Sequence, residues 1–519
     1  MDNRFIELKS LPALAFRTEK NWYIYDRFSN SILKVEKIIV DLIEDIGVTS
    51  LKEIKEKHKI YNYEDIEKAA KEIEDMKQKN IFIKYEVPKL SITNENDPKG
   101  YLEKKLESSL TQLILNITED CNLRCEYCIY SGSYIDKRTH NNLNDMPLNI
   151  AKRAVDFFLS RSQESLVRYI SFYGGEPLLK FSLIKAVIEY ARKLDSNIRF
   201  SLSTNGTLLN EQIMEFMADK EIDIQISLDG SQAIHDKYRK LPNGSGTFNM
   251  IKKNILNMKE NFPRLYAKLS INSVIVPHDF SLDDINFFFS NSELLENIHF
   301  DKIMMKPINP DKNKFYNKYS YREFLSDLYN KLFDIYKKDL LGSTMSEKSI
   351  LPKVLLERTI KRILFRPRKP FSAYLFYWPN GICIPGMRSL FVSSDGSFFP
   401  CEKFYDENDL RIGDIYRGFY YGEILKLIED YCALALTECK KCWAFRFCDD
   451  CFLSAREKQD FNILRKREFC NAKKLTIAFF LLLFVEILEE NPKAFDYLLT
   501  EPFELPSYVK MMLSNEYDK

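Results

Sequence analysis

The sequence predicts an α/β protein centred on a partial (β/α)6 barrel, with a winged-helix-like module before it and a cysteine-rich domain after it. Three observations carry this prediction. Six strand-like apolar runs alternate with helical patterns between about residues 110 and 305, and a hairpin pattern followed by helices fills the first 95 residues. Eight of the eleven cysteines lie between residues 381 and 470. A chain of 519 residues is long enough for three or four domains.

The N-terminal module is predicted from residue patterns that change along the first 95 positions. Trp22–Val35 alternates apolar and polar residues around a Ser-Asn turn, which indicates a hairpin. Helical patterns follow at Glu36–Glu44 and Asn62–Lys79, and Ile81–Tyr85 has the composition of a strand. Strands with three short helices in this order predict a winged-helix-like module, and the polar stretch Asn94–Lys99 is the expected linker.

The barrel is predicted because strand and helix patterns alternate regularly. The expected strands are Gln112–Ile117, Arg168–Phe172, Asn197–Ser203, Asp223–Ser227, Ala267–Ile275 and Ile298–Ile303. The expected helices include Asn149–Ser160, Ser182–Lys193, Glu211–Ala218, Phe248–Glu260 and Leu282–Phe289. Strands separated by helices form right-handed βαβ units with a parallel sheet. About 200 residues hold six such units, fewer than an eightfold barrel requires.

The remaining boundaries follow from composition. We expect domains at residues 1–95, 108–305, 306–380 (a helical bridge), 381–472 (the cysteine-rich domain) and 473–519 (a helical tail). Lysine and arginine number 76 against 75 acidic residues, so no charge bias indicates a nucleic-acid or membrane partner. No secretory signal is visible, and Ile477–Val485 is far shorter than the about 20 apolar residues of a membrane span. We therefore expect a cytoplasmic protein without disulfides.

Three cysteines stand in one short loop directly after the first predicted barrel strand. Cys121, Cys125 and Cys128 occur in the segment CNLRCEYC, which places them at the carboxyl edge of the parallel sheet. Three thiolates can bind three irons of a [4Fe–4S] cluster and leave the fourth iron open for an exogenous ligand. A zinc ion with a fourth ligand elsewhere, and buried free cysteines, are the alternatives.

This Cys-x3-Cys-x2-Cys spacing, with Tyr127 before the last cysteine, resembles the signature of the radical S-adenosylmethionine superfamily. Three further segments stand at successive strand ends in the order of that family: YGGEP (173–177), STNG (203–206) and SLDG (227–230). The resemblance implies that Cys121, Cys125 and Cys128 hold the catalytic cluster and that S-adenosylmethionine binds its open iron. The implied cofactor contacts are Tyr127, Gly174, Gly175, Glu176, Ser203, Asn205, Ser227 and Arg239, with His235 as a structural neighbour.

The C-terminal cysteines follow a second recognisable spacing. Cys383 precedes Gly396-x4-Cys401, then come Cys439-x2-Cys442-x5-Cys448-x2-Cys451 and Cys470. This resembles the SPASM auxiliary-cluster domain, with one residue fewer before Cys451 than its pattern has. The resemblance implies two auxiliary [4Fe–4S] clusters, three clusters in all. Cys439, Cys442, Cys448 and Cys470 would hold one, and Cys383, Cys401 and Cys451 the other, with its fourth iron open or bound by Cys432. A zinc ribbon is the alternative.

SPASM proteins mostly modify peptides, and the N-terminal module resembles the precursor-recognition element of ribosomal peptide maturases. That element binds a leader peptide by β-augmentation, here at Tyr23–Tyr25 or the other hairpin strand, with Asn62–Lys79 as the groove wall. The leading hypothesis is a maturase that installs Cys-to-carbon thioether crosslinks (sactipeptide or ranthipeptide type), reduced by flavodoxin or ferredoxin. The alternatives are a carbon–carbon crosslinking maturase, an anaerobic sulfatase-maturing (formylglycine-forming) enzyme, and a non-catalytic iron–sulfur or zinc peptide-binding protein.

Overall fold

Two compact units make up the chain. The computed structural model describes residues 3–93, 96–128, 130–131, 144–276, 282–307, 321–342, 349–371, 377–378, 383–404, 410–457 and 460–500. Unit 1 comprises residues 1–101, 359–384 and 425–501, and unit 2 comprises 102–358, 385–424 and 502–519. Each unit therefore joins segments that are far apart in the sequence. The five domain boundaries drawn from composition stay predictions, and residues 94–95 of the expected linker and the end of the tail, 501–519, lie outside the described residues.

Unit 1 begins with a four-stranded antiparallel sheet. Its strands are β1 (Phe5–Glu7), β2 (Ala13–Arg17), β3 (Trp22–Asp26) and β4 (Ser31–Val35), paired in chain order. The predicted hairpin is confirmed, because Trp22 pairs with Val35 and Asp26 with Ser31. Of the two hairpin strands that the sequence offered as the edge, Tyr23–Tyr25 lies in a central strand, because β3 also pairs with β2, and the other strand, β4, lies at the edge. The sheet edge next to the helices is β4.

Three short helices follow the sheet in unit 1. They are α1 (Lys37–Leu42), α2 (Leu51–Lys57) and α3 (Tyr63–Gln78). A reciprocal capping box between Ser50 and Glu53 starts α2, and the Asn62 side chain caps α3. The apolar positions of α3, including Ile66 and Ile73, pack into one core with Ile24 and Ile39, which fixes the helices against the sheet.

The predicted strand at Ile81–Tyr85 was wrong, because this segment is irregular. Asn80 and Phe82 both have left-handed φ angles, of 59° and 60°, which are incompatible with a strand. Its neighbouring backbone groups bond elsewhere in unit 1: Tyr85 O accepts from Arg27 Nη2, and Val87 N donates to Lys440 O at 3.1 Å. Distant partners therefore replace strand pairing here.

The C-terminal part of unit 1 is helical. Its elements are the end of α14 (Tyr421–Cys439), β15 (Arg456–Glu457), β16 (Asp460–Phe461), the 28-residue α15 (Ile463–Glu490) and α16 (Asp496–Thr500). Helix α15 packs on β2, and Glu489 Oε1 near its end accepts from Thr18, Asn21 and Tyr23. None of the described helices combines the length and the apolar run needed to cross a bilayer.

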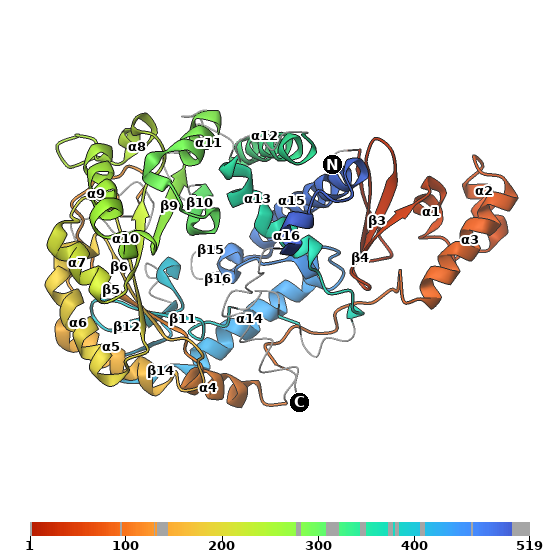
Figure 1. Ribbon diagram of the computed structural model, residues 1–519. Helices are drawn as coiled ribbons and strands as arrows, with labels where there is room; N and C mark the ends of the chain where they lie inside the picture. Colours follow the sequence, from red (N-terminus) through yellow and green to blue (C-terminus); the bar gives the residue numbers. More distant parts are fainter. Residues whose placement is uncertain are drawn as a thin grey trace. The chain divides into compact units, whose positions relative to one another are not determined.

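Unit 2 contains a ten-stranded sheet that includes the six predicted parallel strands. These are β5 (Gln112–Thr118), β6 (Tyr169–Gly174), β7 (Arg199–Thr204), β8 (Asp223–Ser227), β9 (Leu269–Ile275) and β10 (Ile303–Pro307), adjacent in chain order. Between them run α5 (Leu148–Ser160), α6 (Phe181–Leu194), α7 (Glu211–Asp219), α8 (Gln232–Tyr238), α9 (Phe248–Asn261), α10 (Pro263–Tyr266) and α11 (Leu282–Asn291). Helices α5, α6, α7 and α9 lie on the outer side of the strands (Figure 1). The predicted α/β core is confirmed.

Strand β10 begins where the prediction ended. Residues 300–302 form a 3₁₀ turn, capped by the His299 side chain, which accepts from Asp301 N. The strand therefore spans Ile303–Pro307 instead of the expected Ile298–Ile303. The described parts of the predicted bridge contain α12 (Tyr321–Leu341) and α13 (Ile350–Leu364), and α4 (Pro98–Ser108) precedes β5.

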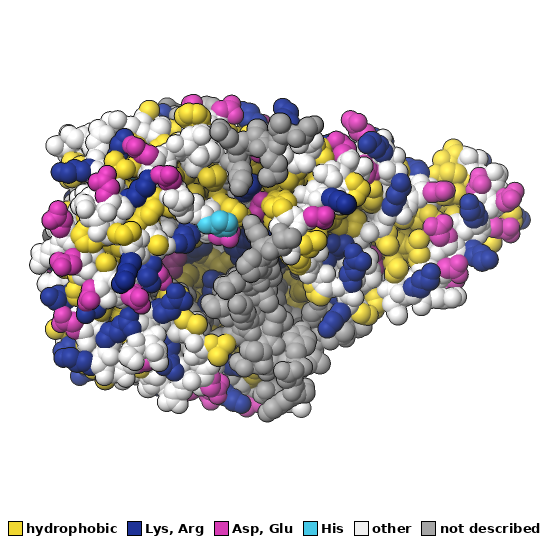
Figure 2. All heavy atoms as spheres, viewed as in Figure 1, with side chains coloured by type: hydrophobic (Ala, Val, Ile, Leu, Met, Phe, Trp, Pro, Cys, Tyr) yellow, Lys and Arg dark blue, Asp and Glu magenta, His cyan; other side chains and the backbone are white. Residues whose placement is uncertain are grey.

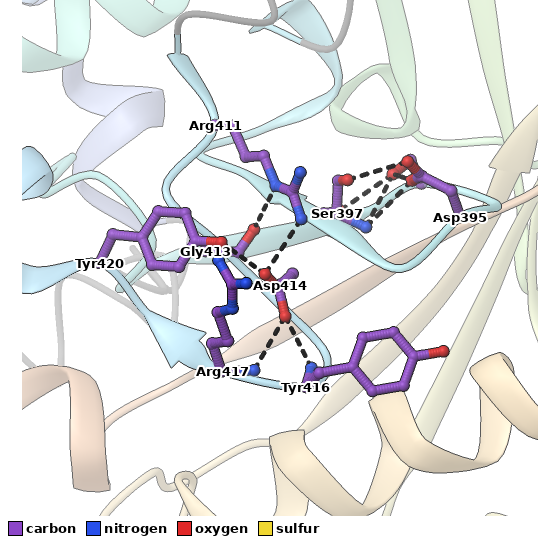
Figure 3. Close-up of polar contacts among 9 residues, drawn as sticks. Asp395, Ser397, Arg411, Gly413, Asp414, Tyr416, Arg417 and Tyr420 are labelled. Carbon is purple, nitrogen blue, oxygen red and sulfur yellow. Dashed lines mark hydrogen bonds and ion pairs between the residues drawn. The ribbon is translucent and has the colours of Figure 1, made fainter.

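The sheet continues past β5 into the first part of the cysteine-rich region. Strand β11 (Ser389–Val392) pairs in parallel with β5 and leads antiparallel into β12 (Ser397–Phe399), β13 (Gly413–Asp414) and β14 (Gly418–Phe419). The Asp414 carboxylate accepts from Arg411, Tyr420 and the amides of Tyr416 and Arg417, which locks this extension (Figure 3). Figure 2 shows charges of both signs interspersed over the visible face, in line with a net charge of +1.

Candidate cofactor and cluster sites

The first candidate site is the cysteine loop that follows β5 in unit 2. The thiols of Cys121, Cys125 and Cys128 border one small apolar cluster with Leu123 and Tyr127. Leu123 N donates to Cys121 Sγ at 3.4 Å, and Cys128 N donates to Cys125 O at 3.0 Å, which curls the loop. Burial raises the pKa of Cys121 and of Cys125 to about 12. Thiols in such surroundings ionise only beside a positive centre, so this donor set fits a cationic iron–sulfur core.

Two glycines join the end of β6 to the stem of the cysteine loop. A Cβ on Gly174 would lie 2.1 Å from Thr118 O, and one on Gly175 would lie 2.1 Å from Asp120 O. Gly174 also has a φ of 141°, which disfavours any side chain. Gly175 N donates to Thr118 O and Glu176 N donates to Asp120 O, both at 2.8 Å. The chain's own packing therefore requires glycine at both positions.

Glu176 is fully buried at the junction of β6 and β7. Its Oε1 accepts from Thr204 Oγ1 at 2.7 Å and from Leu178 N at 3.0 Å, and its Oε2 accepts from Asn205 N at 2.7 Å. Burial nevertheless raises the pKa of Glu176 to about 7. A carboxylate has about four acceptor positions, so one position is left beyond these three protein donors. The sequence prediction of a cofactor contact at Glu176 is compatible with that one position.

Asn205 connects β7 to the cysteine loop. Its Nδ2 donates to Asn122 Oδ1 at 2.8 Å, while its Oδ1 accepts from Thr207 N and Thr207 Oγ1. Asn122 Nδ2 in turn donates to Thr207 Oγ1 at 2.9 Å. The two residues predicted beside it are placed differently: Ser203 Oγ donates to Gln225 Oε1 at 3.2 Å, and Ser227 ends β8 half-buried.

Tyr127 and Arg239 meet at a carboxylate that the predicted site set did not include. Asp229, 1% exposed, accepts at Oδ2 from the Tyr127 hydroxyl and from Arg239 Nε at 2.9 Å, and at Oδ1 from Val274 N at 3.0 Å. The Arg239 guanidinium also lies 5.4 Å from the Tyr127 ring centroid. The bond to Asp229 holds Tyr127, the aromatic residue of the cysteine motif, in position.

His235 is buried and serves as a structural neighbour. Its Nδ1 accepts from Asp229 N at 3.3 Å and its Nε2 bonds Thr247 Oγ1 at 3.1 Å. Burial lowers the pKa of His235 to about 4, so it is neutral near pH 7. Sequence reasoning singled out neither Asp229 nor Thr204 nor Asn122, although the segments SLDG, STNG and CNLRC contain them.

The second candidate site lies in unit 1, where four of the C-terminal cysteines lie near enough for their charges to interact. Cys439 lies at the end of α14, and burial is the largest effect that raises the pKa of its thiol. The neighbouring thiols of Cys442, Cys448 and Cys470 raise this pKa further. These are the four thiols predicted to share one auxiliary cluster. Cys432 lies seven residues earlier in the same helix, about 10.5 Å along its axis. Cys383 and Cys451 belong to unit 1, and Cys401 belongs to unit 2.

Within the described ranges, no three His, Cys, Asp or Glu side chains converge on a point that could hold a single metal ion. A zinc ion needs all its ligands about 2.0–2.3 Å from one centre. The thiolates of a four-iron cluster attach to separate irons instead.

Known proteins share this architecture. Residues 115–285 match the family model of the Radical SAM superfamily. The chain is 28% identical over 355 residues to the cysteine-type anaerobic sulfatase-maturating enzyme of Clostridium novyi (strain NT), covering 66% of this chain and 87% of that one. The structure of native anSMEcpe with bound AdoMet superposes with a TM-score of 0.54 and 23% identity, over 75% of this chain and all of that chain. The same protein with bound AdoMet and Cp18Cys peptide gives 0.52 at 23% identity, over 75% and 98% of the two chains.

These similarities agree with the strand order of unit 2 and with the position of the cysteine loop. The cofactors of such a domain are S-adenosylmethionine and one [4Fe–4S] cluster. Residues 115–285 of this chain therefore match the Radical SAM superfamily, and about two thirds of the chain is similar in sequence to a cysteine-type anaerobic sulfatase-maturating enzyme.

Proposed function

We propose that this protein is a radical S-adenosylmethionine maturase that modifies a ribosomally made precursor peptide by installing Cys-to-carbon thioether crosslinks. The observation that carries the proposal is the free edge of β4 in unit 1. Strand β4 pairs with β3 on one side, and on its other side the described residues supply no partner strand. An extended peptide can add to such an edge by backbone hydrogen bonds, with helix α1 against β3 and α3 in the same core.

In this proposal Cys121, Cys125 and Cys128 hold the catalytic cluster. When bound there, S-adenosylmethionine supplies the radical that removes a hydrogen atom from an unactivated carbon. The protein residues orient the groups around it. Gly174 and Gly175 fix the distance between β6 and the loop, while Glu176 and Asn205 bind β7 to it. Asp229 holds Tyr127 and Arg239 in place behind the cysteines.

The auxiliary cluster on Cys439, Cys442, Cys448 and Cys470 is supported by the grouping of these thiols in unit 1. The assignment of Cys383, Cys401 and Cys451 to another auxiliary cluster, with an open iron or Cys432 as fourth ligand, stays a prediction from the sequence. An open auxiliary iron is suited to a substrate thiolate, which is why the thioether product is preferred to a carbon–carbon crosslink.

A second candidate function is formylglycine formation on a sulfatase. The observation in its favour is the 28% identity to a cysteine-type sulfatase-maturating enzyme over 87% of that protein. The four-stranded sheet with its free β4 edge is the observation that favours a leader-bearing precursor instead.

The test uses the full chain reconstituted anaerobically with iron, sulfide, S-adenosylmethionine and reductant. Its substrate is a cysteine-containing precursor peptide encoded beside the gene, with a truncated form lacking the leader as control. A product that keeps its sulfur, loses two hydrogens per crosslink and forms only with the leader supports the maturase. A product that has lost the cysteine sulfur and carries a hydrazine-reactive aldehyde establishes formylglycine formation. No 5′-deoxyadenosine above background, with peptide binding retained, would leave the binding-protein alternative.

A further inference from the structure

A lysine is buried between the segments of unit 1 that carry the four thiols of the second candidate site. Lys466, in the first turn of α15, is 1% exposed. Its Nζ donates to Asp450 Oδ2 at 2.9 Å and to the Tyr431 hydroxyl at 3.0 Å, and lies 5.3 Å from the Tyr431 ring centroid. Neither the cysteine spacing nor the radical S-adenosylmethionine motifs include this lysine. Burying an ammonium group is energetically costly unless negative groups compensate its charge, so the position of Lys466 requires a compensating partner.

The compensating group in contact with Lys466 is the carboxylate of Asp450, which lies two residues after Cys448 in the sequence. The other contact, Tyr431, lies on α14, the helix that ends at Cys439. Cys470 stands four residues after Lys466 on α15, so the two side chains occupy the same face of the helix one turn apart. The helix that supplies one thiol to this site therefore also supplies a fixed positive charge.

The charge matters most when the site is occupied. A four-iron cluster on four thiolates carries a net negative charge and becomes more negative by one unit on reduction. A cation held close by in a poorly solvated position stabilises the reduced form more than the oxidised form, and the reduction potential of such clusters follows local charge and hydrogen bonding. Asp450 partly offsets Lys466, and Tyr431 orients it without adding charge.

We propose that Lys466 is the internal counter-charge of the Cys439–Cys442–Cys448–Cys470 site and raises the reduction potential of the cluster bound there. Lys466 is a positioning residue that touches no substrate. The inference rests on the cluster assignment made under the proposed function, and it adds a residue that sets the electronic property of that cluster.

The experiment isolates this one cluster in the full-length chain. The background protein carries alanine at Cys121, Cys125, Cys128, Cys383, Cys401 and Cys451, which leaves the four-cysteine site as the intended cluster site. Iron and sulfide are counted, and the ratio of reduced to oxidised cluster is measured by EPR at a series of applied potentials. Lys466→Met is compared with Lys466→Arg, which restores the charge. Arg467→Met is the matched control, because Arg467 pairs with Glu438 at 2.7 Å and is 54% exposed.

We expect Lys466→Met to lower the reduced-to-oxidised ratio at fixed potential at least about tenfold, equivalent to about 59 mV for a one-electron couple. Lys466→Arg should recover most of that change, and Arg467→Met should leave the ratio within about twofold, because exposed charges are screened. An unchanged ratio in Lys466→Met would overturn the proposal.

Two further outcomes are informative. If the background protein binds no iron, the four-cysteine assignment fails, and the inference fails with it. If only Lys466→Met loses its iron, Asp450→Asn decides, since removing this carboxylate leaves Lys466 less balanced and should raise the reduced-to-oxidised ratio. A ratio that does not rise in Asp450→Asn would contradict the role of charge.

Discussion

The glycine turn after β6 makes a sharp prediction about catalysis. Alanine at position 175 would place its Cβ 2.1 Å from Asp120 O, 2.6 Å from Asp120 C and 2.8 Å from Glu119 O. Ordinary contacts begin near 3.4 Å, so the two backbone segments must separate by more than about one ångström. All three clashing atoms are backbone atoms of the residues immediately before Cys121, so no side-chain rotation can relieve them.

A displacement of about 1 Å in a catalytic constellation costs about a hundredfold in rate. We therefore expect Gly175→Ala to reduce the reductive cleavage of S-adenosylmethionine by about two orders of magnitude, measured as 5′-deoxyadenosine released anaerobically. Gly422→Ala, near the start of α14, is the control, because a Cβ there meets nothing within 4 Å. If Gly175→Ala keeps its rate within about twofold of the wild type, the packing argument for this turn is wrong.

Three further predictions concern the turn after β6 and the cysteine loop that it contacts. Because burial raises the pKa of Glu176 from 4.5 to about 7, its protonated form favours the folded state; that stability is complete below about pH 4.5 and is lost as the pH rises through 7. Glu176→Gln should remove this dependence. The unfolding free energy of the wild type minus that of the variant should fall by about 2 kcal/mol between about pH 5 and about pH 7.5, measured by denaturant titration of the apo-protein. A difference that stays constant with pH would refute the assignment. Tyr127→Phe removes a donor to buried Asp229 and should cost about 1.5–3 kcal/mol, read as faster hydrogen exchange at the Val274 amide, which donates to the same carboxylate. Unaltered exchange there would show that the hydroxyl contributes nothing. Cys125→Ala should abolish 5′-deoxyadenosine formation while the iron of the four-cysteine site in unit 1 stays, and retained cleavage would contradict the ligand assignment.

The six parallel strands of unit 2 were predictable because they depend on local periodicity. Strand Asp223–Ser227 matches the prediction at both ends, and the other strands differ by a few residues. The strand expected at Ile81–Tyr85 failed because its apolar composition was the only signal. Phe82 is 1% exposed in a left-handed conformation, stabilised by a core that the local sequence does not reveal.

In the candidate sites too, local sequence predicted some residues and distant contacts determined the others. Motif spacing pointed to the cysteines, but the donors that surround them come from distant segments. Asp229 reaches Tyr127 across 102 residues of chain, and Thr204 reaches Glu176 across 28. No sequence motif marks Lys466, and a lysine in a charged helix normally faces solvent. Its burial and its contacts with Asp450 and Tyr431, which the structure reveals, distinguish it from Lys473 and Lys474 of the same helix.

The discontinuity of unit 1 also has a consequence for biosynthesis. Its first 101 residues complete their packing with residues 425–501, including the bonds from Thr18, Asn21 and Tyr23 to Glu489. At about 5–20 residues per second, the ribosome needs roughly 15–65 seconds to synthesise the intervening chain. During that interval the nascent N-terminal sheet lacks its C-terminal helix, while most of the parallel strands of unit 2 have already emerged. The cluster proposed for the four-cysteine site could be completed only after Cys470, its last thiol, has been synthesised.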